Sequence, residues 1–391
     1  MNTHHVFFAI ITYALLITTA YFLRKSIKID HLKNRYESLD GFRGILAISV
    51  FIHHAAVWKY YIETENWLPP KEIFYNHLGS TSVSFFFMIT SFLFTNKLIK
   101  DYHNKDFDAR AFFISRIFRI VPLYYFSVFL ILIFSLVATH FQIVSTYKDF
   151  LITGFHWATF NIFNKISFNQ FHSLILVNSS VEWSLAYEWF FYFTIPLLAA
   201  TFVTSFKKKF TLSFISLSFI FLFLKYHHVL LLPMLSFLSG AIAPFILKHA
   251  PLIFIKFAQR KIVSLSIIIL VLYLLNSERP FVNFVITSYI FTMIALGNTI
   301  FGVLKSQVLK FLGEISYSTY LLHGIILFVI LYLIIGLENI KKYTDSQYCL
   351  VIFAVAPLVI MVSTISYKYI EAPFIKFGKK IIIRNSTNEK A

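Results

Sequence analysis

The sequence has few charged residues for its length. Only 14% of its 391 residues are Asp, Glu, Lys or Arg, whereas an average soluble domain carries about 25%. Apolar residues make up 58% of the chain, and the mean hydropathy is +0.72. Because so little charge cannot cover a water-facing surface, the composition excludes an ordinary soluble protein and predicts an integral membrane protein.

Cysteine and several catalytic signatures are also scarce. Cys349 is the single cysteine, which excludes an internal disulfide and indicates a small apolar filler. The sequence lacks a phosphate-binding glycine loop, a His-x-x-x-His pattern within an apolar run and a Gly-x-Ser-x-Gly elbow. The sequence therefore shows no motif for ATP hydrolysis or for catalysis by a serine nucleophile. No bound metal is expected.

Apolar runs long enough to approach a membrane span recur along the whole chain. There are eleven of them, at 5–23, 44–61, 79–99, 120–140, 184–206, 209–224, 229–247, 262–276, 281–303, 315–336 and 348–369. The runs 209–224 and 262–276 are short for a hydrocarbon core of roughly 30 Å. We therefore expect an all-α integral membrane protein, a polytopic bundle of about eleven transmembrane helices.

The basic residues test this threading independently. With the connecting segments placed alternately on two sides, 27 of the 35 Lys and Arg residues fall on one side and 8 on the other. The positive-inside rule then puts the N-terminus outside and the C-terminus in the cytoplasm. The formal charge of +17 is thus a topological signal, and no nucleic-acid partner is expected. Since basic residues follow the first apolar run, that run is interpreted as a retained span.

Arg43 and His54 are a pair of ionisable residues on the second run. On a helix they lie on one face, about 20° apart around the axis and roughly 16 Å apart along it, whereas His53 points about 80° away. Arg43 would lie at the cytoplasmic rim and His54 near mid-membrane. A neutral imidazole can accept a proton near pH 7, so His54 is a candidate base. The alternative is a plain hydrogen bond to a neighbouring helix.

Five more ionisable or polar positions lie near the ends of predicted runs. Arg116 and Arg119 share one helix side at the predicted cytoplasmic end of the fourth run, where they could clamp a phosphate or act as ordinary anchors. Glu188 lies about a turn into the fifth run from outside, where a carboxylate needs a catalytic or structural partner. Tyr320 and His323 share a face of the tenth run, with His323 at about the depth of His54. Helix packing is the alternative for this last pair.

Taken in order, these motifs resemble the acyltransferase-3 family of integral-membrane acyltransferases, which includes O-acetylases of bacterial surface polysaccharides. The likeness extends from about 36 to 377 and is carried by Leu39-Asp40-Gly41-Phe42-Arg43-Gly44 with His54 in an Arg-x10-His spacing, Arg116 with Arg119, Trp183-Ser184-Leu185 with Glu188, Ile315-Ser316-Tyr317 to His323, and Ile370-Glu371-Ala372-Pro373.

The sequence departs from the family pattern at several points. A span precedes Leu39, Thr90-Ser91 stands where Ser-Gly is frequent, and Ala372 stands where Arg is frequent. No hydrolase-like domain follows the last run, so we expect the membrane domain to handle the acceptor. The expected organisation is an extra N-terminal helix with a basic linker (1–35), a ten-helix acyltransferase-3-like domain (36–377) and a basic cytoplasmic tail (378–391).

The resemblance implies a protein of the bacterial inner membrane. It also implies transfer of an acyl group, most often acetyl from cytosolic acetyl-CoA, to a sugar hydroxyl. The acceptor would be a glycan of O-antigen, capsule or exopolysaccharide type, or a lipid-linked oligosaccharide. Arg116 and Arg119, with Arg43, would hold the CoA phosphates. His54 would be the general base or a covalent acyl carrier, Glu188 would orient the acceptor or the imidazole, and Tyr320 or His323 would donate to the oxyanion.

A proton-coupled transporter or a flippase for a lipid-linked glycan is the alternative function. Midplane His and Glu residues and a basic inner rim would also suit such a carrier. Many transporters have proline- or glycine-broken helices at matching positions of two repeats, and no such pairing is visible around the prolines of this sequence. The sequence leaves open the sugar, its hydroxyl and the acyl group.

Overall fold

Helices make up all the regular structure of the described residues. The computed structural model describes residues 6–26, 36–104, 107–142, 146–161, 174–202, 206–226 and 230–388, and within these ranges it has no strand. The predicted basic linker at 27–35 lies outside them. The all-α class predicted from composition is therefore confirmed for the described part of the chain.

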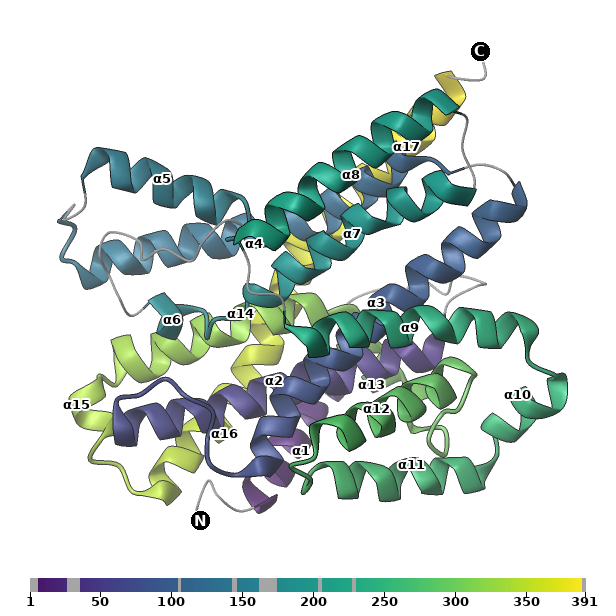
Figure 1. The fold of residues 1–391 in the computed structure, drawn as a ribbon. Helices are drawn as coiled ribbons and strands as arrows, with labels where there is room; N and C mark the ends of the chain where they lie inside the picture. The colour runs from purple at the N-terminus through teal and green to yellow at the C-terminus, as the bar shows by residue number, and fades with distance from the viewer. Residues whose placement is uncertain are drawn as a thin grey trace. The chain divides into compact units, whose positions relative to one another are not determined.

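The chain divides into two compact units, each built from two stretches of sequence. The first unit is Met1–Asn96 with Leu230–Ser363, and the second is Lys97–Val229 with Thr364–Ala391. The first contains α1 (Val6–Leu23), α2 (Glu37–Thr64), α9 (Leu231–His249), α10 (Leu252–Ala258), α11 (Lys261–Leu274), α12 (Pro280–Ala295), η1 (Val303–Lys305), α13 (Gln307–Glu314), α14 (Ser316–Phe328), η2 (Val329–Ile334) and α15 (Leu337–Ile340). The second contains α4 (Ala109–Ala138), α5 (Tyr147–Ala158), α6 (Leu174–Val177), α7 (Trp183–Phe202), α8 (Phe206–Tyr226), η3 (Tyr367–Glu371) and α17 (Ala372–Asn388) (Figure 1). Two helices begin in the first unit and end in the second, α3 (Ile73–Asn104) and α16 (Asp345–Ser366).

The predicted count of eleven spans is not confirmed, although each predicted run overlaps a helix among the described residues. Among the described residues, seven helices are long and apolar enough to cross a membrane, or eight if a bent pair forms one span. That pair is α10 with α11, which meet at 55° (Figure 1). Two further apolar helices, Ser213–Lys225 and Pro280–Ala295, are shorter.

The predicted run 281–303 is too long, because its helix α12 ends at Ala295. Gly297 then takes a φ of +102°, a left-handed conformation that favours glycine. Buried Asn298 follows, and its amide donates to the Ala258 carbonyl at 2.7 Å while its oxygen accepts from the Ser264 hydroxyl at 3.0 Å. These hydrogen bonds hold the end of α12 to the bend between α10 and α11, a junction that hydropathy alone does not reveal.

In the first unit, α2 is packed most closely against α13, and α14 and η1 also contact it. The approach is backbone to backbone. A Cβ added at Gly41 would collide with the Leu304 carbonyl, and one added at Gly313 would collide with the Asp40 carbonyl. The glycine of the Gly41-Phe42-Arg43 segment therefore has a packing role, and it fixes the position of the helix that carries Arg43 and His54.

Beyond the span, a left-handed residue ends α2. Glu65 has a φ of +60°, and its carboxylate accepts a hydrogen bond from the Lys341 ammonium at 2.6 Å. This hydrogen bond lowers the pKa of the Glu65 carboxyl and raises the pKa of the Lys341 ammonium. Lys341 follows α15, so the ion pair joins the end of α2 to a segment far away in sequence.

In the second unit, α7 packs against α8 and α4 packs against α17 (Figure 1). Aromatic rings form both contacts. Phe193 stacks on Phe219 with centroids 3.9 Å apart, and Phe118 meets Phe377 edge to face. The Glu371-Ala372-Pro373 motif does not end a helix, since a π-helical turn at Tyr367–Glu371 leads directly into α17.

Candidate active site

His54 and His323 meet in the first unit, as their predicted common depth suggested. His54 lies on α2 and His323 on α14. The His323 Nε2 and His54 Nδ1 atoms are 3.0 Å apart, and the ring centroids are 4.9 Å apart. His323 is fully buried, whereas His54 is half-buried. The structure thus pairs two imidazoles that are 269 residues apart in sequence.

Backbone carbonyls determine which nitrogens of this pair carry protons. His323 Nδ1 is 3.0 Å from the Thr319 carbonyl, and His54 Nδ1 is 3.0 Å from the Val50 carbonyl. A carbonyl only accepts, so both Nδ1 atoms are donors. In the neutral pair His323 Nε2 is then an acceptor, and the His54 Nδ1–H is shared between Val50 and His323. His54 Nε2 is left as the unprotonated nitrogen, the atom able to take a proton.

Tyr320 and Arg43 lie on the same two helices as the histidine pair, Tyr320 on α14 and Arg43 on α2. The Tyr320 ring lies 6.3 Å from the His323 ring and 6.0 Å from Phe86, and Tyr320 is buried. Arg43 is half-buried on α2. Both residues lie in the same unit as the histidine pair, and their catalytic roles stay predictions.

His53 has a partner of its own on α3, in keeping with the predicted 80° offset. Its Nδ1 donates to the Tyr75 carbonyl at 2.8 Å, and its ring lies 4.8 Å from that of His54. Gly79 makes room for this ring, since an added Cβ there would be 2.5 Å from it. His53 thus packs beside the pair and fixes α2 to α3.

In the second unit, Tyr192 links two predicted site residues that the sequence placed apart. The Tyr192 hydroxyl donates to Glu188 Oε2 at 2.9 Å, and the Arg116 guanidinium interacts with both Tyr192 and Glu188. Arg116 also donates to the Ser115 hydroxyl at 2.9 Å. Arg119 interacts electrostatically with Arg116 and with Tyr192. We call Arg116, Arg119, Glu188 and Tyr192 the arginine network.

The arginine network brings together two residues that the sequence analysis assigned to opposite sides. The sequence put Arg116 at the cytoplasmic rim and let Glu188 approach from the outer side, but the two side chains share Tyr192. Tyr192 itself was missed. Its position four residues after Glu188, one helical turn away, was the available signal. Two guanidinium groups accompany one carboxylate here, so the network keeps an excess positive charge.

The described residues hold no group of three or more His, Cys, Asp or Glu side chains arranged to bind a metal. The histidine pair offers a base, and the arginine network offers a cationic surface.

Comparisons with known proteins agree with this chemistry. A family model described as an acyltransferase domain matches residues 36–368. A provisionally named O-acetyltransferase of Staphylococcus aureus strain COL is 27% identical over 386 residues, covering 90% of this chain and 59% of that protein. The O-acetyltransferase OatA of S. aureus strain NCTC 8325 is 27% identical over 374 residues, covering 88% of this chain and 57% of its own length. The chain thus spans less than two thirds of these relatives. No solved structure matches it.

Proposed function

Because the chain belongs to the acyltransferase domain family, we propose that it is a membrane-bound O-acetyltransferase. The donor is cytosolic acetyl-CoA, and the acceptor is a sugar hydroxyl of a cell-surface or lipid-linked polysaccharide. The observation that carries this proposal is the His54–His323 pair, which leaves His54 Nε2 unprotonated. The names of the two S. aureus relatives support acetyl as the transferred group.

His54 acts on the acceptor in the simplest form of the reaction. Its Nε2 takes the proton of the sugar hydroxyl as the hydroxyl oxygen forms a bond to the thioester carbonyl carbon. The carbon–sulfur bond then breaks, the acetyl group stays on the sugar, and the departing CoA sulfur receives the proton from His54. The alternative is attack by His54 Nε2 itself, with the acetyl group carried briefly on the imidazole before it passes to the sugar.

His323 positions His54 in either route. By accepting the His54 Nδ1–H it fixes the tautomer, and it stabilises the positive charge that His54 acquires when Nε2 is protonated or acylated. This role replaces the predicted one as an oxyanion donor, because both His323 nitrogens are engaged, Nδ1 with Thr319 and Nε2 with His54. Tyr320 is then the candidate donor to the oxyanion.

The arginine network is the candidate site for the anionic part of the donor. Arginine binds phosphate through paired N–H donors, and the network keeps more positive than negative groups after Glu188 is counted. Glu188 and Tyr192 would fix the Arg116 guanidinium in one orientation before the donor arrives. Arg43 is the third candidate phosphate ligand, on the strength of the charge pattern of the sequence.

The decisive experiment supplies inside-out vesicles containing the full chain with acetyl-labelled acetyl-CoA. We expect covalent label on a glycan, released by mild alkali as expected for an ester. Vesicles with His54→Ala at matched expression are the control and should give no label above background. Movement of glycan across the membrane without any covalent label would contradict the proposal and support the carrier alternative.

A further inference from the structure

The short helix α10 exposes apolar side chains at one end of the first unit. It has seven residues, a length of roughly 10 Å, which is too short to cross a membrane. Leu252 and Ile253 are 75% and 77% exposed, and Phe257 is exposed as well. A group of large apolar side chains on a surface indicates contact with a membrane or another molecule. This end of α10 therefore has an apolar surface that needs a partner.

Basic side chains accompany this apolar surface. Lys256 lies on α10, and Arg260 and Lys261 lie where α10 meets α11 at an angle of 55°. All three are exposed. The sequence has no Asp or Glu between Glu188 and Glu278, so no acidic neighbour in the chain balances them. Three cations in the hydrocarbon core would be costly, and the bend therefore suits the level of the lipid headgroups.

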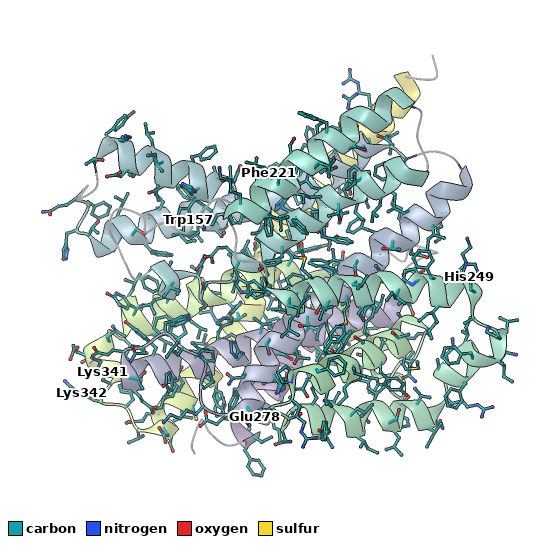
Figure 2. The ribbon with its side chains drawn as sticks, viewed as in Figure 1. Trp157, Phe221, His249, Glu278, Lys341 and Lys342 are labelled. Carbon is teal, nitrogen blue, oxygen red and sulfur yellow. The ribbon has the colours of Figure 1, made fainter. Side chains whose placement is uncertain are left out.

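The arrangement of the first unit agrees with a position at the cytoplasmic surface. The charge pattern puts the segment 248–261 inside and puts Glu278 and Lys342 outside. Figure 2 shows His249, the last residue of α9, at one end of this unit, and it shows Glu278 and Lys342 far from that end. The segments that the threading assigns to different sides are thus far apart in the unit.

The segment 298–305 lies against the bend and extends the same surface. The hydrogen bonds from Asn298 to Ala258 and Ser264 hold the two together, and the Gln259 amide donates to the Leu296 carbonyl at 3.1 Å. Phe301 follows Asn298 by three residues, so the chain keeps it within roughly 11 Å of that residue. The Phe301 ring is 52% exposed. Further along, Lys305 adds another exposed cation.

The turn that carries Phe301 is held against its backbone preference. Ile300, Phe301 and Gly302 have φ values of 46°, 56° and 88°, and a β-branched residue rarely adopts this conformation. The Asn298 side chain accepts a hydrogen bond from the Ile300 N–H at 2.8 Å, and the Thr299 hydroxyl accepts one from the Gly302 N–H at 3.0 Å. Backbone strain of this kind often accompanies a functional role. Core packing does not explain it here, because the ring in the turn is exposed.

We propose that α10, its bend and the segment 298–305 bind an anionic phospholipid of the cytoplasmic leaflet. We call this area the interfacial surface, and its main residues are Leu252, Lys256, Arg260, Lys261, Phe301 and Lys305. The basic groups would bind the headgroup phosphate, and the apolar side chains would lie among the acyl chains.

The composition of the interfacial surface favours a lipid over other acidic partners. Its cations favour an anionic headgroup over a zwitterionic one. The apolar side chains next to those cations would remain in water if the partner were a free phosphate, whereas a lipid covers both parts at once. The inference does not depend on the proposed function, because lipid binding needs neither acetyl-CoA nor an acceptor.

Native mass spectrometry of the full-length chain in a non-ionic detergent measures this binding. The chain is titrated with phosphatidylglycerol and, in parallel, with phosphatidylcholine that has the same acyl chains. Arg260→Gln combined with Lys261→Gln removes two cations of the interfacial surface. Lys71→Gln combined with Lys342→Gln is the matched control, because it removes two exposed cations from segments predicted to lie outside.

We expect the wild-type chain to bind phosphatidylglycerol more tightly than phosphatidylcholine. The Arg260 and Lys261 double variant should bind phosphatidylglycerol about 25-fold more weakly, since each basic residue near an anionic lipid contributes about fivefold. The control should bind as the wild type does. If the double variant does not fold, Lys256→Gln combined with Lys305→Gln removes two other exposed cations of the surface.

Phe301→Asn tests the apolar part separately. Asparagine tolerates a positive φ, so the variant should melt at or above the wild-type temperature. It should bind both lipids roughly tenfold more weakly, because the ring no longer leaves water. The preference for phosphatidylglycerol should stay, since the cations are unchanged.

Three results would overturn the proposal. The first is a wild-type chain with no preference for phosphatidylglycerol, and the second is equal phosphatidylglycerol binding by the control and by the charge variants. The third is a dimer in the spectra that dissociates in the Arg260 and Lys261 variant, since a second copy of the chain would then cover the surface. None of these results bears on acyl transfer, which the labelled vesicles test independently.

Discussion

At the scale of single residues, backbone carbonyl groups determine the different tautomeric roles of His54 and His323. His54 and His323 each use Nδ1 against the carbonyl four residues earlier, Val50 and Thr319. The difference is that His54 Nδ1 also faces His323 Nε2. His323 thus has its unprotonated nitrogen against its partner, whereas His54 has its unprotonated nitrogen, Nε2, outside the contact between the two rings.

Replacing His54 by alanine should abolish acyl transfer while the protein still inserts into the membrane. A general base contributes about 10²- to 10⁴-fold to a rate, and a covalent acyl carrier contributes more. Initial rates at matched expression measure the loss. Near-normal transfer by this variant would remove His54 from the mechanism, whereas His53→Ala should retain far more activity because His53 bonds to the Tyr75 carbonyl instead.

His323→Ala should lower kcat by about 10²-fold and leave both KM values close to normal, because it removes a partner of the base and no group that binds substrate. His323→Gln tests the positioning role, since the glutamine carbonyl can still accept the His54 Nδ1–H. Partial rescue by glutamine is the expected outcome. Equal loss in the two variants, with a raised acceptor KM, would assign His323 to substrate binding instead.

In the arginine network, Arg119→Ala and Arg116→Ala should raise the KM for acetyl-CoA more than the KM for the acceptor. Each removes about one charge-assisted phosphate contact, which corresponds to roughly tenfold in affinity or more. Tyr192→Phe should have a smaller effect of the same kind, because it removes the hydroxyl partner of Glu188 and Arg116 but leaves both charges in place. Steady-state kinetics in vesicles measure the two KM values. An unchanged KM for acetyl-CoA in both arginine variants would exclude the arginine network as the donor site.

At the scale of elements, the helix that carries the base is fixed by backbone contact. Where Gly41 meets the Leu304 carbonyl and Gly313 meets the Asp40 carbonyl, α2, η1 and α13 leave no space for a side chain. The register of α2, and with it the position of His54, depends on these glycines more than on any polar interaction.

Gly313→Ala should therefore destabilise the protein, although alanine is the better helix former. An added methyl group in a filled core costs roughly 1–3 kcal/mol, and here the obstacle is a backbone carbonyl that has little freedom to move. Gly154→Ala on α5 is the matched control, because nothing lies within 4 Å of its added Cβ. Thermal denaturation in detergent compares the two, and equal melting temperatures would contradict the close approach.

The apolar runs of the sequence indicated where the long helices lie, and helical geometry put His54 and His323 at a common level, which agrees with their contact. The sequence did not reveal the bend between α10 and α11 or the early end of α12, which depend on Asn298 bonding to residues far away in sequence. It also missed Tyr192, since aromatic residues are abundant and only the fold shows which hydroxyl meets a carboxylate. The tautomers of His54 and His323 depend on nearby backbone carbonyls, and a sequence motif contains no information about these contacts.

At the scale of the whole molecule, the distribution of basic residues remains the strongest topological argument. The predicted threading puts 27 basic residues on one side and 8 on the other, and the positive-inside rule predicts the orientation of the chain from this difference. An odd number of spans puts the two ends of the chain on opposite sides, and an even number puts them on the same side.

Reporter fusions to the two ends can therefore test the predicted eleven spans. A C-terminal fluorescent protein that matures only in the cytoplasm should be bright, and an N-terminal epitope tag should be reached by antibody from outside. Both tags on the cytoplasmic side would indicate an even count, as when the α10–α11 pair enters and leaves on one face.

The close backbone contacts of α2 at Gly41 and Gly313 affect how the protein responds to the thickness of the surrounding bilayer. Bilayers of different thickness force helices to tilt or slide, and side chains at a contact usually absorb part of that movement. A contact made by backbone atoms at Gly41 and Gly313 has no such compliant layer. We therefore expect α2 to move together with η1 and α13 as one body, so that their packing is preserved in short-chain and long-chain lipids alike.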